Sequence, residues 1–354
     1  MKPRRFAAAA VLFCLILPGT VLAQVQLANS VSLSADYDDN VFNAADHPED
    51  DFLLRLFYSL DLDYPANKAN LLYFRYRLGA KKYLNLISED ALINLGQFGY
   101  EYRGFTRQSV GAEVEAKLRN TRSTNDDYYK LIATGHWSYN FPMNFLLRLQ
   151  GVYSQFDYRR YHYFDYWSQQ YSLDLRKYFG YEFSAGFDYA LQNKQYPTKA
   201  YTNIGSKNTG QILALSTRNR VDNEHDLTAL AEYSGWLLAK FSYTFQINDS
   251  NSYGESYYNH RLVLALSKGI FKRTNVHLLG ILQFAKSRDR VLLPHVFQIE
   301  EEDEDLSSVA FKVSQGILDW LSIEAQYSRY WDQLGYGRPV FQKDLYSLGV
   351  SMKF

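Results

Sequence analysis

The last eleven residues, 344–354, alternate between apolar side chains and side chains that are mostly small or polar. Successive side chains of a β-strand point to opposite faces, so a strand with this pattern has one apolar face and one polar face. Such a strand fits a wall with lipid on one side and water on the other. The apolar positions are Tyr346, Leu348, Val350, Met352 and Phe354.

A strand that ends on an aromatic residue, with aromatic or aliphatic residues at alternate positions before it, resembles the assembly signal of bacterial outer-membrane β-barrels. The resemblance implies that the five apolar positions above are this signal. It also implies that the barrel-assembly machinery and outer-membrane lipid, including lipopolysaccharide, are partners of the chain.

The same alternation recurs along the whole chain. Between residues 109 and 119, for example, Val110, Val114 and Leu118 alternate with Glu113, Glu115 and Arg119. We predict strands at about 30–38, 52–64, 71–83, 91–103, 109–119, 128–140, 144–156, 166–179, 183–193, 226–236, 237–248, 257–269, 274–286, 306–317, 321–332 and 343–354.

Short and long connectors alternate between these strands, which is typical of outer-membrane barrels with short periplasmic turns and long outer loops. We therefore predict an all-β, transmembrane, antiparallel up-and-down β-barrel of about 16 strands, with 14 or 18 as the alternatives. A soluble β-sandwich is the competing fold. It fits less well, because the chain is 17% aromatic while its mean hydropathy is −0.35.

The amino terminus has the features of a secretory leader. Lys2, Arg4 and Arg5 precede an apolar run, and short side chains at 21–23 precede the expected cleavage site. We predict a signal peptide at residues 1–23 and one outer-membrane barrel domain at residues 24–354. Cleavage would remove Cys14, the only cysteine, so no disulfide is expected.

The polar faces of the predicted strands supply candidate residues that line the lumen. Their positive and negative charges nearly balance, so two readings stay open: an ion-pair network within the wall, and a wet pore that contacts a polar solute. The longest connector, about 194–225, is expected to be a loop that could fold into the lumen. The principal candidates are Arg55, Arg75, Arg77, Lys81, Glu113, Glu115, Arg119, Arg148, Arg176, Lys240 and Arg261.

No motif indicates catalysis, a cofactor or a metal site. The acidic run at residues 300–305 is read as a solvated outer loop, with a divalent-cation site as the less favoured reading. His225 lies near Asp222 and Asp226, a grouping that would suit a membrane-embedded hydrolase, but no GxSxG motif is present. We expect no enzyme activity and, because the formal net charge is zero, no nucleic-acid partner.

Residues 34–42, SADYDDNVF, are followed by an acidic loop and then by FLLRL at residues 52–56. This opening resembles outer-membrane β-barrel proteins associated with exopolysaccharide synthesis and export systems. The resemblance implies a Gram-negative outer-membrane porin, a passive conduit through which a polysaccharide is secreted. It also implies polysaccharide export components as partners.

Two other functions fit the same barrel. One is a general or solute-selective diffusion porin. The other is the barrel sheath of a porin–cytochrome electron conduit, for which about sixteen strands is small.

Overall fold

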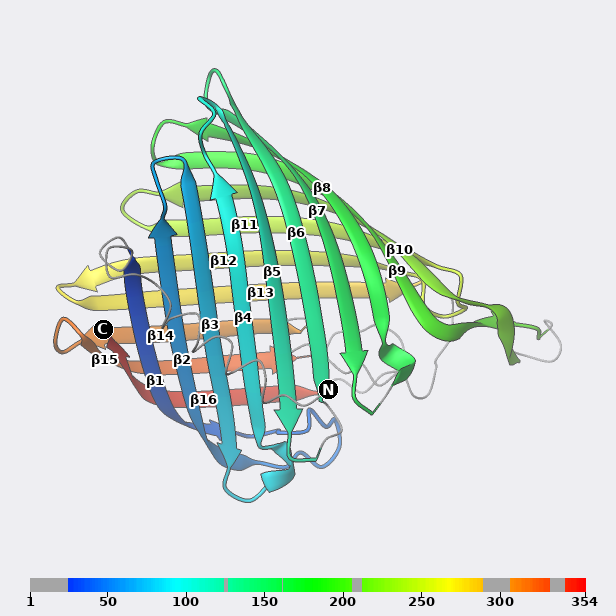
Figure 1. The fold of residues 1–354 in the computed structure, drawn as a ribbon. Helices are drawn as coiled ribbons and strands as arrows, with labels where there is room; N and C mark the ends of the chain where they lie inside the picture. Colours follow the sequence, from blue (N-terminus) through cyan, green and yellow to red (C-terminus); the bar gives the residue numbers. More distant parts are fainter. Residues whose placement is uncertain (1–24, 124–126, 161, 206–211, 289–305, 332–340) are drawn as a thin grey trace.

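The structure, a computed structural model, describes residues 25–123, 127–160, 162–205, 212–288, 306–331 and 341–354. Within these ranges, sixteen strands form one closed antiparallel sheet (Figure 1). Each strand pairs with its neighbours in the sequence, and β16 closes the ring by pairing with β1. The predicted sixteen-strand up-and-down barrel is therefore confirmed.

Most strand boundaries lie within a few residues of the predicted ones. Two short 3₁₀ helices, η1 (Ile87–Glu89) and η2 (His162–Phe164), interrupt the connectors. No helix in the described part of the chain is long and apolar enough to cross a membrane. The strands are β1 (Gln26–Asp38), β2 (Asp51–Pro65), β3 (Asn70–Tyr83), β4 (Ala91–Tyr102), β5 (Gln108–Thr121), β6 (Tyr128–Phe141), β7 (Phe145–Tyr158), β8 (Tyr166–Phe179), β9 (Phe183–Asn203), β10 (Leu213–Ser234), β11 (Leu238–Ser250), β12 (Tyr257–Phe271), β13 (Thr274–Ser287), β14 (Ser307–Gly316), β15 (Leu321–Trp331) and β16 (Gln342–Lys353).

The alternation in β5 shows how the sequence sorts the two faces of the wall. Val110, Val114 and Leu118 are exposed, whereas Glu113 and Arg119 on the other face are partly buried. Exposed leucine, phenylalanine, tyrosine and tryptophan side chains recur around the sheet. The barrel thus has an apolar outer surface, which is the reverse of a soluble protein.

The β1–β16 seam completes the hydrogen-bond ladder that closes the barrel. Its register runs from the pair Ser30–Lys353 to the pair Asp38–Leu345. At one end of the seam, Asn29 and Phe354 exchange two backbone hydrogen bonds of 3.1 and 2.9 Å. A closed ladder leaves no edge strand with unpaired backbone groups.

Residues 34–42, the stretch that carries the family resemblance, secure the other end of the seam. Lys343 Nζ lies 2.9 Å from Asp38 Oδ2, and both side chains are almost completely buried. The Asn40 amide donates to the Gln342 carbonyl (3.0 Å), and the Asp344 N–H donates to Asp39 Oδ1 (2.7 Å). This stretch therefore has a structural role in closing the barrel.

The two ends of the barrel differ in their connectors. Tight turns join β2 to β3, β6 to β7, β8 to β9 and β14 to β15 at one end, which we call the short-turn end. The other end, the long-loop end, carries the longer connections (Figure 1). This is the alternation that the sequence predicts.

The segment 194–225 differs from its prediction as a loop. Strands β9 and β10 are 21 and 22 residues long, so most of this segment forms a hairpin that continues the wall beyond the long-loop end (Figure 1). Its pairing has register shifts between Leu215 and Asn219 and between Asn219 and Val221. The alternation fades here because a hairpin beyond the membrane has no lipid on either face.

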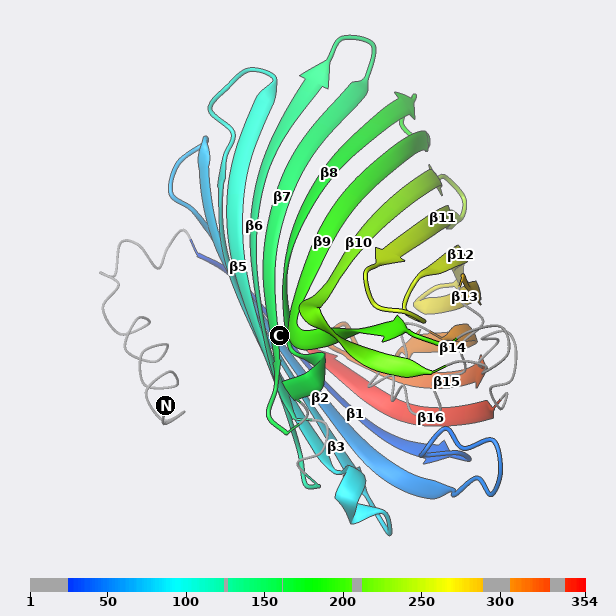
Figure 2. The ribbon, with the colours of Figure 1, turned by 90° about the vertical axis from the view of Figure 1, so that its right-hand side faces the viewer.

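The far part of this hairpin is held by the β11–β12 connector. The Tyr201 N–H donates to Ser252 Oγ at 3.0 Å, and the Tyr253 N–H donates to the Tyr201 carbonyl at 2.8 Å. Arg220 pairs with Asp222 at 2.6 Å and also contacts Glu255 at 3.0 Å. In the view onto the long-loop end, the hairpin extends across the opening towards β14 and β15 (Figure 2).

Asp51 fixes another connector at the long-loop end. Its carboxylate accepts the N–H groups of Asn85 (2.8 Å) and Leu86 (2.7 Å) and the Asn85 side-chain amide (2.9 Å). Burial alone would raise the pKa of Asp51, but these hydrogen bonds favour the carboxylate and the net pKa is lowered. The charged form of Asp51 therefore stabilises the folded connector.

Deleting Phe354 is expected to reduce the yield of folded barrel, because the deletion removes both backbone hydrogen bonds to Asn29 at the seam. The measurement is the fraction of protein that shows the faster, heat-sensitive band on SDS gels. Phe354→Tyr keeps the backbone and the ring and is the matched control. An unchanged folded fraction after deletion would contradict this role.

Asp51→Asn is expected to lower the free energy of unfolding by about 1 kcal/mol near neutral pH. Because the folded pKa of Asp51 is depressed, its contribution is complete above the usual value of 3.8 and is lost as the pH falls below it. The difference in unfolding temperature between wild type and variant should therefore shrink on acidification towards about pH 3. A difference that grows on acidification would contradict the assignment.

Candidate functional site

The charged face of the wall lines the inside of the barrel, where side chains from different strands converge. Tyr73 on β3 reaches over β4, and its hydroxyl donates to Glu113 Oε2 on β5 at 2.6 Å. The strand between them carries Gly99, where a Cβ atom would lie 2.1 Å from the tyrosine ring. Only glycine at this position leaves room for the contact.

The predicted lumen residues Arg75 and Arg77 belong to an ion-pair network. Arg75 lies 3.1 Å from Asp61 and 2.5 Å from Asp63, and Arg77 lies 2.8 Å from Asp61. Directly opposed residues on antiparallel strands share a face, and Asp61 is opposite Arg75 in the register. This group supports the wall-network reading of these arginines.

A second network joins β8, β10 and β11. Arg176 lies 3.2 Å from Glu232, which also lies 3.4 Å from Lys240. Asp174 contributes a longer contact of 3.6 Å to Arg176. Asp174 is directly opposite Asp188, so two carboxylates face each other on this part of the wall.

The other predicted arginines make different contacts. Arg55 pairs with the buried Asp36 at 3.1 Å and stands opposite Lys81 in the register. The Nε atoms of Arg119 and Arg148 are buried and have no hydrogen-bond partner among the described residues.

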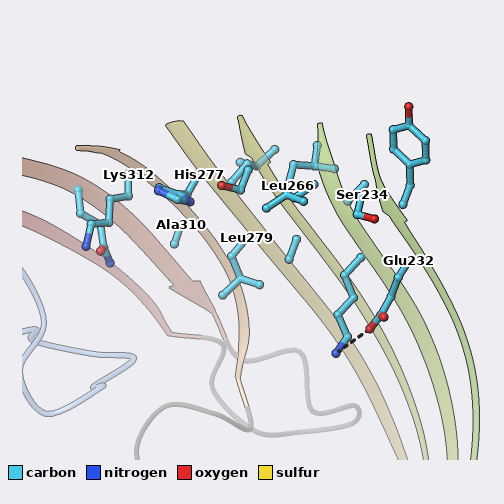
Figure 3. Close-up of a pocket in the computed structure, with 15 residues that line it drawn as sticks. Glu232, Ser234, Leu266, His277, Leu279, Ala310 and Lys312 are labelled. Atoms are coloured by element: carbon cyan, nitrogen blue, oxygen red, sulfur yellow. Dashed lines mark ion pairs between the residues drawn. The ribbon is translucent and has the colours of Figure 1, made fainter. Parts of the chain in front are cut away.

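A recess of about 570 Å³ lies in the inner wall towards the short-turn end (Figure 3). Its floor includes small and apolar side chains, among them Ala265, Leu279 and Ala310. Polar groups border the recess: the Glu232–Lys240 pair on one side, and Lys312 with His277 and Gln326 on the other. The recess thus offers an apolar surface with hydrogen-bond donors and acceptors around it.

Comparisons with solved structures find outer-membrane proteins at low similarity. A bacterial polysaccharide outer membrane secretin is 8% identical with a TM-score of 0.48, over 92% of this chain and 98% of that chain. OmpT, an outer membrane protein of Vibrio cholerae, is 9% identical with a TM-score of 0.49, over 93% of this chain and 99% of that chain. A mutant of the Rh. blastica porin is 9% identical with a TM-score of 0.41, over 93% and 100%. No family model matches the sequence, and no curated protein matches it.

Phe57 lies on the charged face, a position that the sequence pattern did not predict, because the residues on both sides of it are apolar. It is opposite Ser32 and Gly79 in the register, and its side chain is 42% exposed. In the sequence, three consecutive apolar residues at 56–58 conceal which face each one takes. Arg55, Phe57 and Ser59 follow one another at two-residue intervals, so they share a face of the strand; this spacing is the signal that could have placed Phe57 on the inner face.

A buried aromatic cluster on β6 and β7 was also missed. Tyr128, Phe156 and Tyr158 are at most 5% exposed, and they lie on the charged face near the long-loop end. The ammonium groups of Lys117 and Lys130 lie 5.6 and 5.8 Å from the centroids of the Tyr128 and Phe156 rings. Each lysine therefore makes a cation–π contact with the cluster.

The histidine considered for hydrolase chemistry lies apart from the carboxylates that suggested it. His225 is on β10 rather than in a loop, on the face opposite to that of Asp222 and Asp226, and its Nδ1 is 2.9 Å from the Tyr189 hydroxyl. Among the described residues, no group of three or more His, Cys, Asp or Glu side chains could hold a metal ion. The predicted leader and the acidic run at 300–305 lie outside the described residues.

Arg75→Ala is expected to lower the free energy of unfolding, by on the order of 1 kcal/mol, because it leaves Asp63 without its cation, while Asp61 keeps Arg77. Arg148→Ala is the matched comparison, since Arg148 makes no ion pair within the described residues. It should leave the unfolding temperature near that of the wild type while changing single-channel conductance. If both variants lower the unfolding temperature equally, the contrast between a structural Arg75 and a non-structural Arg148 is wrong.

Proposed function

We propose that this chain is an outer-membrane porin of a Gram-negative bacterium and that it acts as a passive conduit for exopolysaccharide secretion. The observation that carries the proposal is that the closed wall places apolar side chains on its outer face and charged side chains on its inner face. The outer face is apolar, and the inner face carries charged residues and the recess described above. A cylinder of this kind is stable only with lipid outside and water inside.

The connectors give the expected orientation in the membrane. We place the short-turn end in the periplasm and the long-loop end outside the cell. The recess then lies near the end at which a polymer leaves the periplasm, and the hairpin of β9 and β10 projects outside the cell. In this arrangement lipopolysaccharide surrounds the outer half of the barrel, and export components meet the short turns.

The chemistry of the inner wall is compatible with a saccharide cargo. Sugars present apolar C–H faces and a rim of hydroxyl groups, so they bind where an apolar surface is bordered by donors and acceptors. The recess provides such a surface at Leu279 and Ala310, with His277 and Gln326 beside it. The resemblance of residues 34–42 to barrels associated with exopolysaccharide export adds support for this cargo.

A solute-selective diffusion porin is the second candidate. The recess of about 570 Å³ is within the usual size range of a site for one small ligand. A diffusion porin would use it to select a small solute instead of guiding a polymer. The two functions share the same barrel and differ in the length of the molecule that passes.

Deletion of the gene tests the conduit function in the cell. We expect secreted polysaccharide to fall and polymer to accumulate in the periplasm, because the deletion removes the proposed route of the polymer through the outer membrane. Complementation with the wild-type gene should restore secretion. If secretion is unchanged and uptake of a small solute is lost, the conduit proposal is wrong and the diffusion porin is the better description.

A further inference from the structure

The recess in the inner wall has an aliphatic floor, although the rest of this face is mostly polar. The register places Ala265 on β12 opposite Leu279 on β13, and Leu279 opposite Ala310 on β14. We call these three residues the aliphatic row. Leu279, at its centre, is 37% exposed. An apolar patch that faces water is a feature by which ligand sites are recognised.

The apolar surface continues in the next row towards the long-loop end. There Val263 on β12 is opposite Ile281 on β13, and Leu230 on β10 lies in the same row beyond Ser242. No phenylalanine, tyrosine or tryptophan lines the recess from the inner face within the described residues. The recess therefore offers small and branched aliphatic groups, which suit a methyl group better than the flat face of a sugar ring.

A row of polar side chains runs beside the aliphatic row, two residues nearer the short-turn end. In this polar row His277 is opposite Lys312, and Lys312 is opposite Gln326 (Figure 3). Two residues along a strand correspond to about 7 Å. One sugar unit with its substituent can therefore contact both rows.

The polar row provides both hydrogen-bond donors and an acceptor. Lys312 Nζ lies 2.8 Å from Glu324 Oε2, and an ammonium group has three donors, so two remain for a ligand. The side-chain amide of Gln326 donates to Ser328 Oγ at 2.9 Å, which leaves its carbonyl oxygen as an acceptor. A group that accepts one hydrogen bond and donates another is thus matched here.

The charged groups around the recess are paired with one another. Glu232 lies 3.4 Å from Lys240 and 3.2 Å from Arg176. At the other side, Lys312 has Glu324 as its partner. A charged ligand would have to compete with these ion pairs, whereas a neutral one leaves them intact. The recess therefore favours a neutral ligand.

We propose that the recess binds the acetamido group of an N-acetylated sugar, so that the cargo of the conduit is a neutral polysaccharide with N-acetylated units. This inference rests on the proposed conduit function and names its substrate class. The methyl group packs on Leu279 and Ala310. The carbonyl oxygen accepts a hydrogen bond from Lys312 Nζ, and the amide N–H donates to Gln326 Oε1.

The test is the block of single channels in planar bilayers by three hexasaccharides with the same backbone linkage. N-acetylchitohexaose carries an acetamido group on the second carbon of each ring, cellohexaose a hydroxyl, and the glucosamine hexamer an ammonium. For the wild type, we expect the acetylated hexamer to block about ten-fold longer than cellohexaose, because it adds a methyl contact and a hydrogen bond. The glucosamine hexamer should block no longer than cellohexaose, since it lacks the acetyl group.

Two variants remove the two kinds of contact separately. Leu279→Ser removes the aliphatic contact, and Gln326→Leu removes the acceptor for the amide N–H. Each should shorten block by the acetylated hexamer by about three-fold or more and leave block by cellohexaose near the wild-type value. Block is measured on inserted channels, so a lower yield of folded barrel does not affect the comparison.

Leu95→Ser is the matched control. It makes the same substitution on the inner face of β4, where Leu95 is opposite Arg77 and far from the recess around the ring. It should alter block by neither hexamer. A loss of the preference in this variant would show that the lumen as a whole sets the preference, and would overturn the assignment to the recess.

Each remaining outcome also decides the matter. Equal block of the wild type by the acetylated hexamer and cellohexaose, or a preference that survives both recess variants, overturns the N-acetylated cargo and leaves the conduit standing. Longest block by the glucosamine hexamer overturns the neutral cargo. A channel that conducts salt but is blocked by none of the hexamers overturns the conduit as well.

Discussion

Closure of the hydrogen-bond ladder between β1 and β16 is the constraint on which the rest of the structure depends. A barrel wall in lipid has no water to satisfy an open strand edge, so the first and last strands must meet in register. The buried Asp38–Lys343 pair and the amide of Asn40 secure one end of that seam, and Phe354 secures the other. Once the ring is closed, each strand has a fixed inner and outer face.

That division of faces also determines where charge can accumulate. The inner wall carries ion pairs between neighbouring strands, such as Arg75 with Asp61, and lysines beside aromatic rings, such as Lys117 and Lys130. The two groups occupy different strands.

Glycine positions allow inner side chains to cross from one strand to another. Gly99 makes room for Tyr73 to reach Glu113, and Gly79 leaves open space beside Phe57. In one case the space is filled by the protein itself, and in the other it faces the lumen. Glycine thus makes room for a contact within the wall at one site and leaves open space beside Phe57 at the other.

The sequence alone determined the fold class, a strand number of about sixteen with fourteen or eighteen as alternatives, and a division of side chains between two faces, because lipid and water on opposite faces impose a two-residue period. Closure of the sheet decided the number. The sequence pattern failed where that contrast is absent. Within residues 194–225, the far parts of β9 (to Asn203) and β10 (from Leu213) form a hairpin with both faces outside lipid, so no alternation marks the strands there. Three apolar residues in succession likewise hid the inward position of Phe57.

Only the tertiary structure decided which charges meet. Asp61 lies fourteen positions before Arg75 and Lys343 lies far from Asp38 in the sequence, yet the register places each pair within ion-pair distance. The alternation assigns a side chain to a face but not to a neighbour, since the neighbour depends on the pairing of whole strands and on closure of the ring. For this reason Arg75 and Arg119 look equivalent in the sequence and differ in the barrel.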